Sequence, residues 1–468
     1  MKKLLSCMLL VSSFAMANSH DEAHKPKSFN ASGRKIVFVN YKEITYQITY
    51  DINRGRAHAL ADMTFTATEA GYPVFDSVVR PTNVTLNGKR VNATEVKAPQ
   101  GETEMRIPSE QVSVGEHKMT VEVPLGSKNY GGGGVPAQFG GGAVRSAFWN
   151  SDIDNRGLLE RYLPTNFEFD RIKMKFIVNL VGAKVPHSIF TNGTQKEIAP
   201  NVFEIDFPNY FTSSSLYFHV TPTAGVKSIT FDINSKFGNK IPTTIYTLAG
   251  ANADSELASF KAATTKLIAE LENDYGKYPH PSLLIYAQSP NGGGGMEYAG
   301  AAVTSLGALG HEVIHSFFGR GVMPANGNAG WIDEAIASWR DRGYPNFSEL
   351  NFQTRMGNQP YYTRWTNVNA YDYGSRFIGY MNYKLGDIKP FLADLLANDK
   401  FKPLFTEEFM AKMEAFYGKS FAAEFNQYIM NSRDVLPSQR RGRFKELGVD
   451  EIHPIHKPIP EAKLIEML

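Results

Sequence analysis

The sequence predicts an α+β protein with more than one domain, in which an antiparallel β domain precedes a mixed, mainly helical domain. Residues 36–225 consist of short alternating runs such as ADMTFTATEA, separated by Asn-Gly, Gly and Pro, and this pattern is typical of half-buried strands. After about residue 226 strand patterns mix with helical periodicity, which dominates from residue 375 onward. With 468 residues, 42% of them hydrophobic, the chain is long enough for two or three domains.

The first seventeen residues, MKKLLSCMLLVSSFAMA, are expected to be a cleaved signal peptide. Lys2 and Lys3 precede an apolar run, and a small-residue Ala-Met-Ala site stands before Asn18. The apolar run is shorter than the roughly 20 residues that span a bilayer, and no other segment could span one. The mature protein is therefore expected in the periplasm or outside the cell. Residues 18–35 are polar and aperiodic, so we expect them to be flexible.

Loss of the signal peptide also removes Lys2, Lys3 and the only cysteine, Cys7. The mature chain then has 47 basic and 47 acidic residues and no thiol. Disulfides, thiolate catalysis and cysteine-ligated zinc are excluded. A net charge near zero argues against nucleic acid as a partner.

The second domain is expected to cover residues 226–433. SITFDIN, TTIYTLAG and PSLLIYAQSP are predicted strands, and the last is followed by the glycine-rich NGGGGMEYAG. Between them, DSELASFKAATTKLIAELENDYG has apolar residues at helical spacing, with Asp254 or Ser255 as its N-cap. Residues 434–468 are rich in proline and charge and are expected to form a tail.

The segment HEVIHSFFGRGVMPANGNAGWIDEAIASW carries a pattern that favours a metal site. His311 and His315 are one helical turn apart, so both imidazoles project from one face of a helix. Glu312 points to the side of that pair, where it can hydrogen-bond a water molecule. After a Gly- and Asn-rich break, Glu334 lies on a second helix, with eighteen residues between it and His315. Two histidines and a carboxylate form the ligand set of an open tetrahedral zinc site.

Such a site predicts hydrolysis. Zinc lowers the pKa of water to about 7, and a glutamate at hydrogen-bond distance can take its proton as the water attacks a carbonyl. We therefore expect one Zn²⁺ per chain, bound by His311, His315 and Glu334, with Glu312 as the general base.

The same residues resemble a known family. HEVIH, followed by WIDEAIASW, resembles the zinc motif of the aminopeptidase N family of gluzincin metallopeptidases. The segment from Gly294 to Tyr298 is similar to that family's Gly-x-Met-Glu-Asn exopeptidase motif. The resemblance implies a thermolysin-like catalytic domain, substrate contacts from Gly295, Met296, Glu297 and Tyr298, and binding of a peptide's free α-amino group by Glu297.

Further along the chain, Tyr371-Asp372-Tyr373-Gly374 resembles the family's Tyr-Glu-Lys-Gly segment. This resemblance implies that Tyr371 stabilises the oxyanion of the reaction, with Tyr373 as a competing candidate.

The sequence also departs from the family. Tyr298 stands where the family usually has Asn, and only thirteen residues separate Glu297 from His311. The large C-terminal helical domain that usually roofs the active site is missing from this sequence, which implies a more open cleft.

The sequence therefore predicts a zinc aminopeptidase acting on peptides with a free N-terminus. Two alternatives within enzymes are an endopeptidase and a glycyl-aminopeptidase-like enzyme on the same zinc core. A third alternative, from another class, is a catalytically silent peptide-binding or envelope protein. The sequence does not specify the oligomeric state.

Overall fold

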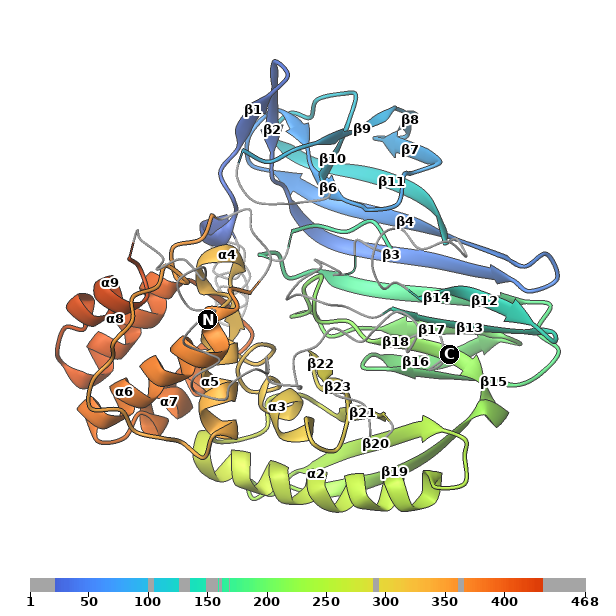
Figure 1. Cartoon of the computed structure of the whole chain (residues 1–468). Helices are drawn as coiled ribbons and strands as arrows, with labels where there is room; N and C mark the ends of the chain where they lie inside the picture. The colour runs from blue at the N-terminus through green and yellow to red at the C-terminus, as the bar shows by residue number, and fades with distance from the viewer. Residues whose placement is uncertain are drawn as a thin grey trace, which may run out of the picture.

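A computed structural model describes residues 22–99, 105–125, 135–148, 159, 162–167, 169–288, 294–360 and 366–431. The predicted signal peptide and the predicted tail at 434–468 lie outside these residues. Figure 1 shows a β-rich N-terminal region, coloured blue to green, beside a region coloured yellow-green to red that contains helices α2 (Ala253–Tyr275) to α9 (Ala422–Tyr428). Within the described part of the chain, no helix is long and apolar enough to cross a membrane.

The N-terminal domain is built on an eight-stranded sheet. β14 and β3 pair in parallel, and every other neighbouring pair is antiparallel. Apolar residues alternate with polar ones along β3, so its Ile and Tyr side chains are buried on one face. The strands, in spatial order, are β16 (Thr194–Ala199), β17 (Val202–Asp206), β14 (Lys173–Val181), β3 (Asn40–Asp51), β4 (Arg56–Ala67), β11 (Gly115–Leu125), β7 (Asn83–Leu86) and β8 (Lys89–Arg90).

Three smaller sheets complete this domain. A shared aromatic core joins the four-stranded sheet to the large one, with Phe176 against Phe148 and Phe218 at ring-centroid distances of 6.0 and 5.7 Å. The remaining strands are β12 (Val135–Gly140), β13 (Ala143–Phe148), β18 (Phe218–Pro222) and β15 (His187–Thr191) in one sheet; β1 (Phe29–Ala31), β2 (Arg34–Val37) and β5 (Tyr72–Pro73) in the second; and β6 (Phe75–Asp76), β10 (Met105–Pro108) and β9 (Ala93–Val96) in the third.

The segment expected to be flexible is partly ordered. Residues 22–24 are helical, and β1 and the start of β2 lie before residue 36. Phe29 is buried, and His24 contacts the Phe405 ring at 4.7 Å while its Nε2 lies 2.8 Å from Glu408 Oε2. The prediction of flexibility is wrong for residues 22–35, because contacts with distant parts of the chain supply the burial that the local sequence pattern does not show.

The second domain contains a five-stranded sheet. β20, β21 and β23 run parallel, and β22 is an antiparallel edge strand. α2 (Ala253–Tyr275) packs against the sheet through Leu267, Ile268 and Leu271. It begins at Ala253 with Asn252 as its N-cap, whereas Asp254 or Ser255 was expected. The strands are, in spatial order, β19 (Val226–Asn234), β20 (Lys240–Leu248), β21 (Leu283–Ala287), β23 (Ala301–Thr304) and β22 (Gly295–Tyr298).

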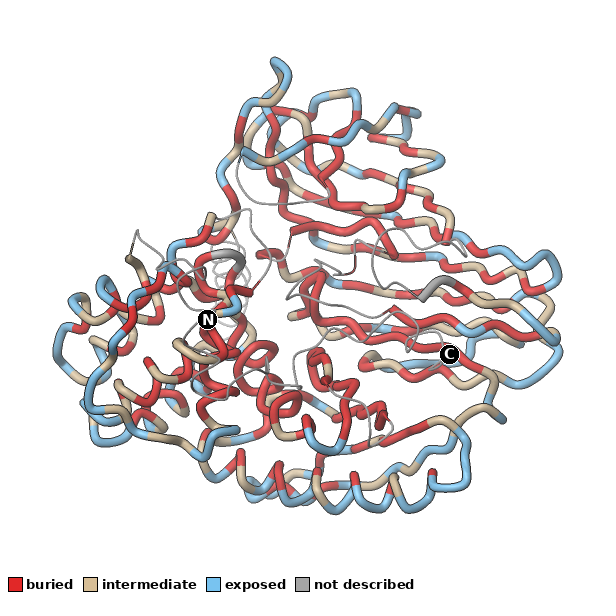
Figure 2. The backbone as a smooth tube through the Cα atoms, viewed as in Figure 1, coloured by how far each residue is buried: buried red, intermediate tan, exposed pale blue. Residues whose placement is uncertain are grey.

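α5 packs against α3, α6 and η3, and it carries two of the largest buried side chains, Trp331 at its N-cap and Trp339. Figure 2 shows that buried residues fill the interior of both domains. A Cβ at Gly374, the last residue of η3, would lie 2.8 Å from the Ala335 Cβ, so the glycine lets η3 approach α5 closely. The elements that follow β23 in the chain are α3 (Leu309–Ile314), α4 (Asn326–Ala329), α5 (Ile332–Asp341), the π-helical turn η3 (Ala370–Gly374), α6 (Ser375–Leu385), α7 (Lys389–Asp399), α8 (Thr406–Tyr417) and α9 (Ala422–Tyr428), with the short strands β24 (Met323–Pro324) and β25 (Pro403–Leu404).

Candidate active site

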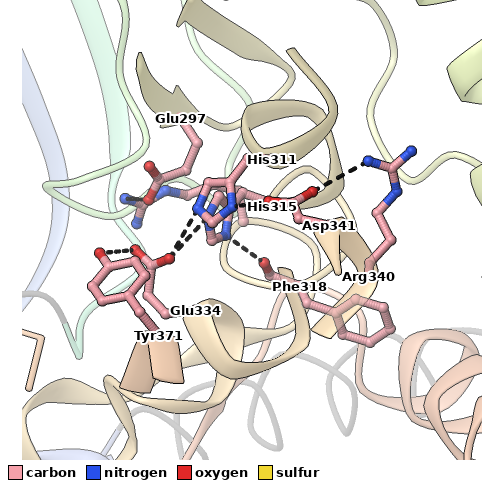
Figure 3. A network of polar contacts seen from close by, with 9 residues as sticks. Glu297, His311, His315, Phe318, Glu334, Arg340, Asp341 and Tyr371 are labelled. Atoms are coloured by element: carbon pink, nitrogen blue, oxygen red, sulfur yellow. Dashed lines mark hydrogen bonds and ion pairs between the residues drawn. The ribbon is translucent and has the colours of Figure 1, made fainter. Parts of the chain in front are cut away.

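The structure brings His311, His315 and Glu334 together (Figure 3). His311 lies on α3, His315 caps the C-terminus of that helix, and Glu334 lies in the first turn of α5. His311 Nε2 is 3.2 Å from His315 Nε2 and 3.0 Å from Glu334 Oε2, and His315 Nε2 is 3.5 Å from the same oxygen. All three side chains are at least 95% buried.

The second nitrogen of each imidazole is also engaged. His311 Nδ1 lies 2.7 Å from Asp341 Oδ2, and His315 Nδ1 lies 3.1 Å from the carbonyl oxygen of Phe318. An Nδ1–H donor to each of these oxygens leaves a lone pair on each Nε2, and two lone pairs facing each other favour a cation between them. In a tetrahedral zinc site with bonds of about 2.0–2.1 Å, the ligand atoms stand about 3.3 Å apart. The spacing and chemistry of these three side chains therefore fit Zn²⁺.

Burial and neighbouring charges shift the pKa values at the site. Burial is the main cause that raises the pKa of Glu312 to about 8, and the charge of Glu297 adds to it while that of His311 opposes it. Burial lowers the pKa of His311, but hydrogen bonds to Asp341 and Glu334 outweigh burial and raise it to about 10. These shifts arise because carboxyl groups and imidazoles are crowded together out of water, and a cation bound at the two Nε2 atoms would favour the neutral imidazoles and the ionised Glu312 instead.

A glycine makes room for Glu312. A Cβ built on Gly295 of β22 would lie 2.5 Å from the Glu312 carboxyl group. Contacts this short do not occur in real structures, so any other residue at position 295 would displace the Glu312 side chain. Gly295 thus acts on the site through its lack of a side chain.

Tyr371 reaches the site and Tyr373 does not. The Tyr371 hydroxyl donates a hydrogen bond to Glu334 Oε1 at 2.7 Å, as Figure 3 shows. The Tyr373 ring packs instead against Phe352, with a ring-centroid distance of 4.5 Å, at the border of the hydrophobic core. Of the two candidates for the oxyanion role, the structure therefore favours Tyr371.

The predicted substrate-binding residues divide between the two faces of β22. Gly295 and Glu297 face α3, whereas Met296 and Tyr298 lie on the other face in a buried aromatic cluster, where the Tyr298 ring is 5.0 Å from that of Tyr217. Successive side chains of a strand point to opposite faces, so a four-residue motif cannot present all its side chains to one ligand. The side chains of Met296 and Tyr298 therefore point away from α3, and substrate contacts of these two residues stay a prediction.

Glu297 itself forms a buried ion pair. Its Oε1 accepts a hydrogen bond from Arg320 Nη2 at 2.8 Å, and Arg320 Nη1 donates to Ser214 Oγ of the N-terminal domain at 2.5 Å. These contacts connect the exopeptidase-like motif with both domains.

Sequence reasoning missed Asp341 and Arg320. Asp341 lies seven residues after Glu334 on α5, two turns along the same face of the helix, so helical periodicity could have identified it. Arg320 follows Gly319, whose φ of 125° sets a turn that the sequence pattern does not specify. Its contact with Ser214 spans 106 residues, which no local signal predicts.

No protein-family model matches the chain, and no curated protein is similar to it in sequence. Solved structures are similar in fold. Among them are M1 zinc metallopeptidases and leukotriene A4 (LTA4) hydrolases. The fold is that of the M1 zinc metallopeptidases. This similarity confirms the predicted fold class, a β-rich domain followed by a mainly helical one.

A single-residue mutant of the M1 zinc metallopeptidase from Deinococcus radiodurans aligns with a TM-score of 0.61 and 16% identity, over 85% of this chain and 96% of that one. Its complex with a Tyr-Ser-Ala substrate aligns with a TM-score of 0.58 and 16% identity, over 81% and 91% of the two chains. Yeast LTA4 hydrolase aligns with a TM-score of 0.61 and 13% identity, over 87% of this chain and 71% of that one.

Proposed function

We propose that this protein is a zinc-dependent aminopeptidase that hydrolyses the N-terminal peptide bond of peptides. The observation that carries the proposal is the buried group of His311, His315 and Glu334, with Glu312 beside it and Glu297 facing the same side. The fold of the M1 zinc metallopeptidases supports it, since a single-residue mutant of one of these was crystallised with a Tyr-Ser-Ala substrate.

Each side chain has a distinct task in the proposed reaction. His311, His315 and Glu334 would hold Zn²⁺, which when bound would supply a Lewis acid for the substrate carbonyl and for water. Glu312 takes a proton from the attacking water and delivers it to the nitrogen of the leaving group as the C–N bond breaks. The Tyr371 hydroxyl donates a hydrogen bond to the developing oxyanion, a contact worth about a hundredfold to a thousandfold in rate.

Substrate orientation follows from β22. As the edge strand of its sheet within the described residues, β22 can pair with an extended peptide through its main chain. Glu297 then binds the substrate ammonium through a charge-assisted hydrogen bond, which fixes the scissile bond one residue from the free end. This arrangement supports an exopeptidase.

The test compares matched peptides with free and N-acetylated termini, incubated with purified protein of known zinc content. The proposal predicts chelator-sensitive release of the first amino acid from the free peptides and no cleavage of the acetylated ones. Internal cleavage of acetylated peptides would favour the zinc endopeptidase instead. Absence of cleavage of either peptide by zinc-loaded protein would favour the silent peptide-binding protein.

We further propose, from residues 1–17 alone, that the mature enzyme works in the periplasm or outside the cell. N-terminal sequencing of the protein from fractionated cells tests this. A chain beginning near Asn18 outside the cytoplasm supports the proposal, and an intact Met1 in the cytoplasm contradicts it.

A further inference from the structure

Arg320 is a buried cation that the mechanism above does not use. Only 7% of its surface is exposed, and it donates to Glu297 Oε1 at 2.8 Å and to Ser214 Oγ at 2.5 Å. Taking a guanidinium group out of water is costly unless its charge is paired. The position of Arg320 against the proposed amine-binding carboxylate therefore calls for an explanation.

A backbone turn directs the Arg320 side chain toward Glu297 of β22. The Arg320 amide donates to the carbonyl oxygen of His315 at 2.8 Å, which closes the turn after the zinc-binding segment. Gly319 makes this turn with a φ of 125°, a conformation that side chains strongly disfavour, and a Cβ there would lie 3.1 Å from His315 Nδ1. The same turn therefore holds a zinc-binding histidine and the arginine that contacts Glu297.

The N-terminal domain contacts the guanidinium group at Nη1, whereas Glu297 is bound through Nη2. Ser214 is buried, and its hydroxyl also lies 3.2 Å from Thr212 Oγ1 within a run of buried Ser and Thr residues. Nearby, the Ala299 amide donates to the Ser215 carbonyl oxygen at 3.1 Å, so this segment is joined to the end of β22. The contacts on both sides leave Arg320 little freedom to turn away from Glu297.

Glu297 needs such a contact because a second buried carboxyl group lies close to it. Asp333 offers a carboxylate oxygen within 4.8 Å of ligand atoms of both Glu297 and His315, and Asp333 is itself buried. Like charges repel strongly where water is excluded. A cation fixed on Oε1 offsets this repulsion, while the second oxygen can accept a hydrogen bond from a substrate ammonium.

We propose that Arg320 is a positioning residue that holds the Glu297 carboxylate in place for the substrate's amino terminus and thereby determines how strongly the enzyme distinguishes free from blocked N-termini. The proposal rests on the proposed aminopeptidase function. Arg320 acts through Glu297 and does not itself touch the reacting atoms.

The test measures binding and kinetics on zinc-loaded protein. Calorimetry gives the affinities of leucinamide, which has a free amine, and N-acetyl-leucinamide, which has none. The variants are Arg320→Gln, Arg320→Lys, Glu297→Gln and the double variant Arg320→Gln/Glu297→Gln. Zinc content and circular dichroism establish that each variant is loaded and folded.

The expected result is selective. Arg320→Gln weakens leucinamide binding at least about tenfold, since loss of one partner of a buried ion pair is costly, and leaves N-acetyl-leucinamide binding unchanged. With leucyl coumarinylamide as substrate, KM rises by a similar factor while kcat changes little. Arg320→Lys recovers part of the affinity. The double variant binds leucinamide no more weakly than Glu297→Gln does, because Arg320 acts through that carboxylate.

Three results would overturn the proposal: unchanged leucinamide affinity in Arg320→Gln, equal weakening of both ligands, or additive losses in the double variant. If Arg320→Gln does not fold, Ser214→Ala replaces it, and an unchanged leucinamide affinity there counts against the proposal. Failure of the aminopeptidase function has a different signature, since wild-type protein would then release no amino acid from free peptides. The binding comparison still decides the role of Arg320 in that case.

Discussion

At the scale of single residues, the site depends on the contact that each imidazole makes through Nδ1, the ring nitrogen that faces away from the other zinc ligands. His311 has Asp341 on Nδ1, and His315 has the Phe318 carbonyl on Nδ1. These contacts fix the ring orientations and direct both Nε2 atoms to one point. Arg340 in turn contacts Asp341, with Nη1 3.3 Å from Oδ1, so the supporting carboxylate is itself held.

Replacement of Asp341 is therefore expected to weaken zinc binding. Asp341→Asn keeps the shape of the side chain but removes the charge that supports His311, and outer contacts of this kind are worth about 10-fold to 100-fold in metal affinity. Competition with a chromophoric chelator measures the change. Asp372→Asn, at a partly exposed carboxylate that pairs with Arg342, serves as the control and is expected to bind zinc like the wild type. Equal affinity in the two variants would contradict the supporting role of Asp341.

Replacement of Tyr371 is expected to slow the chemical step. Tyr371→Phe removes the hydroxyl proposed to stabilise the oxyanion, so kcat falls by about a hundredfold to a thousandfold with a small change in KM. Tyr373→Phe is the matched control, because that ring packs against Phe352 away from the zinc ligands. Steady-state kinetics of both variants decide the assignment. A larger loss in Tyr373→Phe would reverse it.

Much of this site could be predicted from the sequence. The spacing of His311 and His315 requires only helical periodicity, and the helix after the Gly-rich break supplies Glu334. The motif resemblance implies substrate contacts from Met296 and Tyr298, but strand alternation directs their side chains to the opposite face. The pairing of Arg320 with Ser214 depends on how the domains pack, which the local sequence does not determine.

At the scale of secondary-structure elements, β22 and α3 must lie close together for the site to form. Gly295 permits this contact, since a Cβ there would meet the Glu312 carboxyl group at 2.5 Å. The sequence shows the glycine but not its neighbour. Its importance becomes evident only when strand and helix are seen side by side.

Gly295→Ala is expected to reduce activity by displacing Glu312 while zinc remains bound. The general base contributes about a hundredfold to ten-thousandfold, so a displaced carboxylate can cost much of that range in kcat. Gly307→Ala is the control, because a Cβ at that position meets no atom within 4 Å. Assays of turnover and zinc content separate the two effects. Wild-type turnover in Gly295→Ala would show that the contact is not needed.

Element boundaries were predicted less well than element types. α2 was expected and is present, but it begins at Ala253 with Asn252 at its N-cap. β1 was not expected, because its three residues form a strand only by pairing with β2 and by burying Phe29 in a cluster that includes Phe167. Such short strands carry too few residues to show a periodic pattern.

At the scale of the whole molecule, the two domains meet beside the site. The Tyr210 ring stacks on Phe401 with a centroid distance of 3.5 Å, and its hydroxyl lies 3.0 Å from His280 Nδ1. Arg320 and Ser214 belong to the same interface. The order of the two domains along the chain was predictable, whereas this interface depends on contacts between residues far apart in sequence.

Zinc is expected to stabilise the whole fold. The residues that bind it come from α3, its C-cap and α5, and an ion that binds only the folded protein shifts the folding equilibrium toward the folded state. Removing the metal with a chelator should lower Tm by several degrees, and restoring zinc should reverse the loss. Differential scanning calorimetry measures this. His315→Ala is the control and should show no zinc-dependent shift. An equal shift in wild type and His315→Ala would place the stabilising metal elsewhere.

The central claim is that Glu312 performs proton transfer at a zinc centre held by His311, His315 and Glu334. The most direct measurement compares wild type with Glu312→Gln, with zinc content and release of free amino acid from leucyl coumarinylamide determined on the same samples. The account predicts about one zinc per chain in both proteins and a loss of at least about a hundredfold in kcat for the variant. Undiminished turnover in zinc-loaded Glu312→Gln would contradict the account.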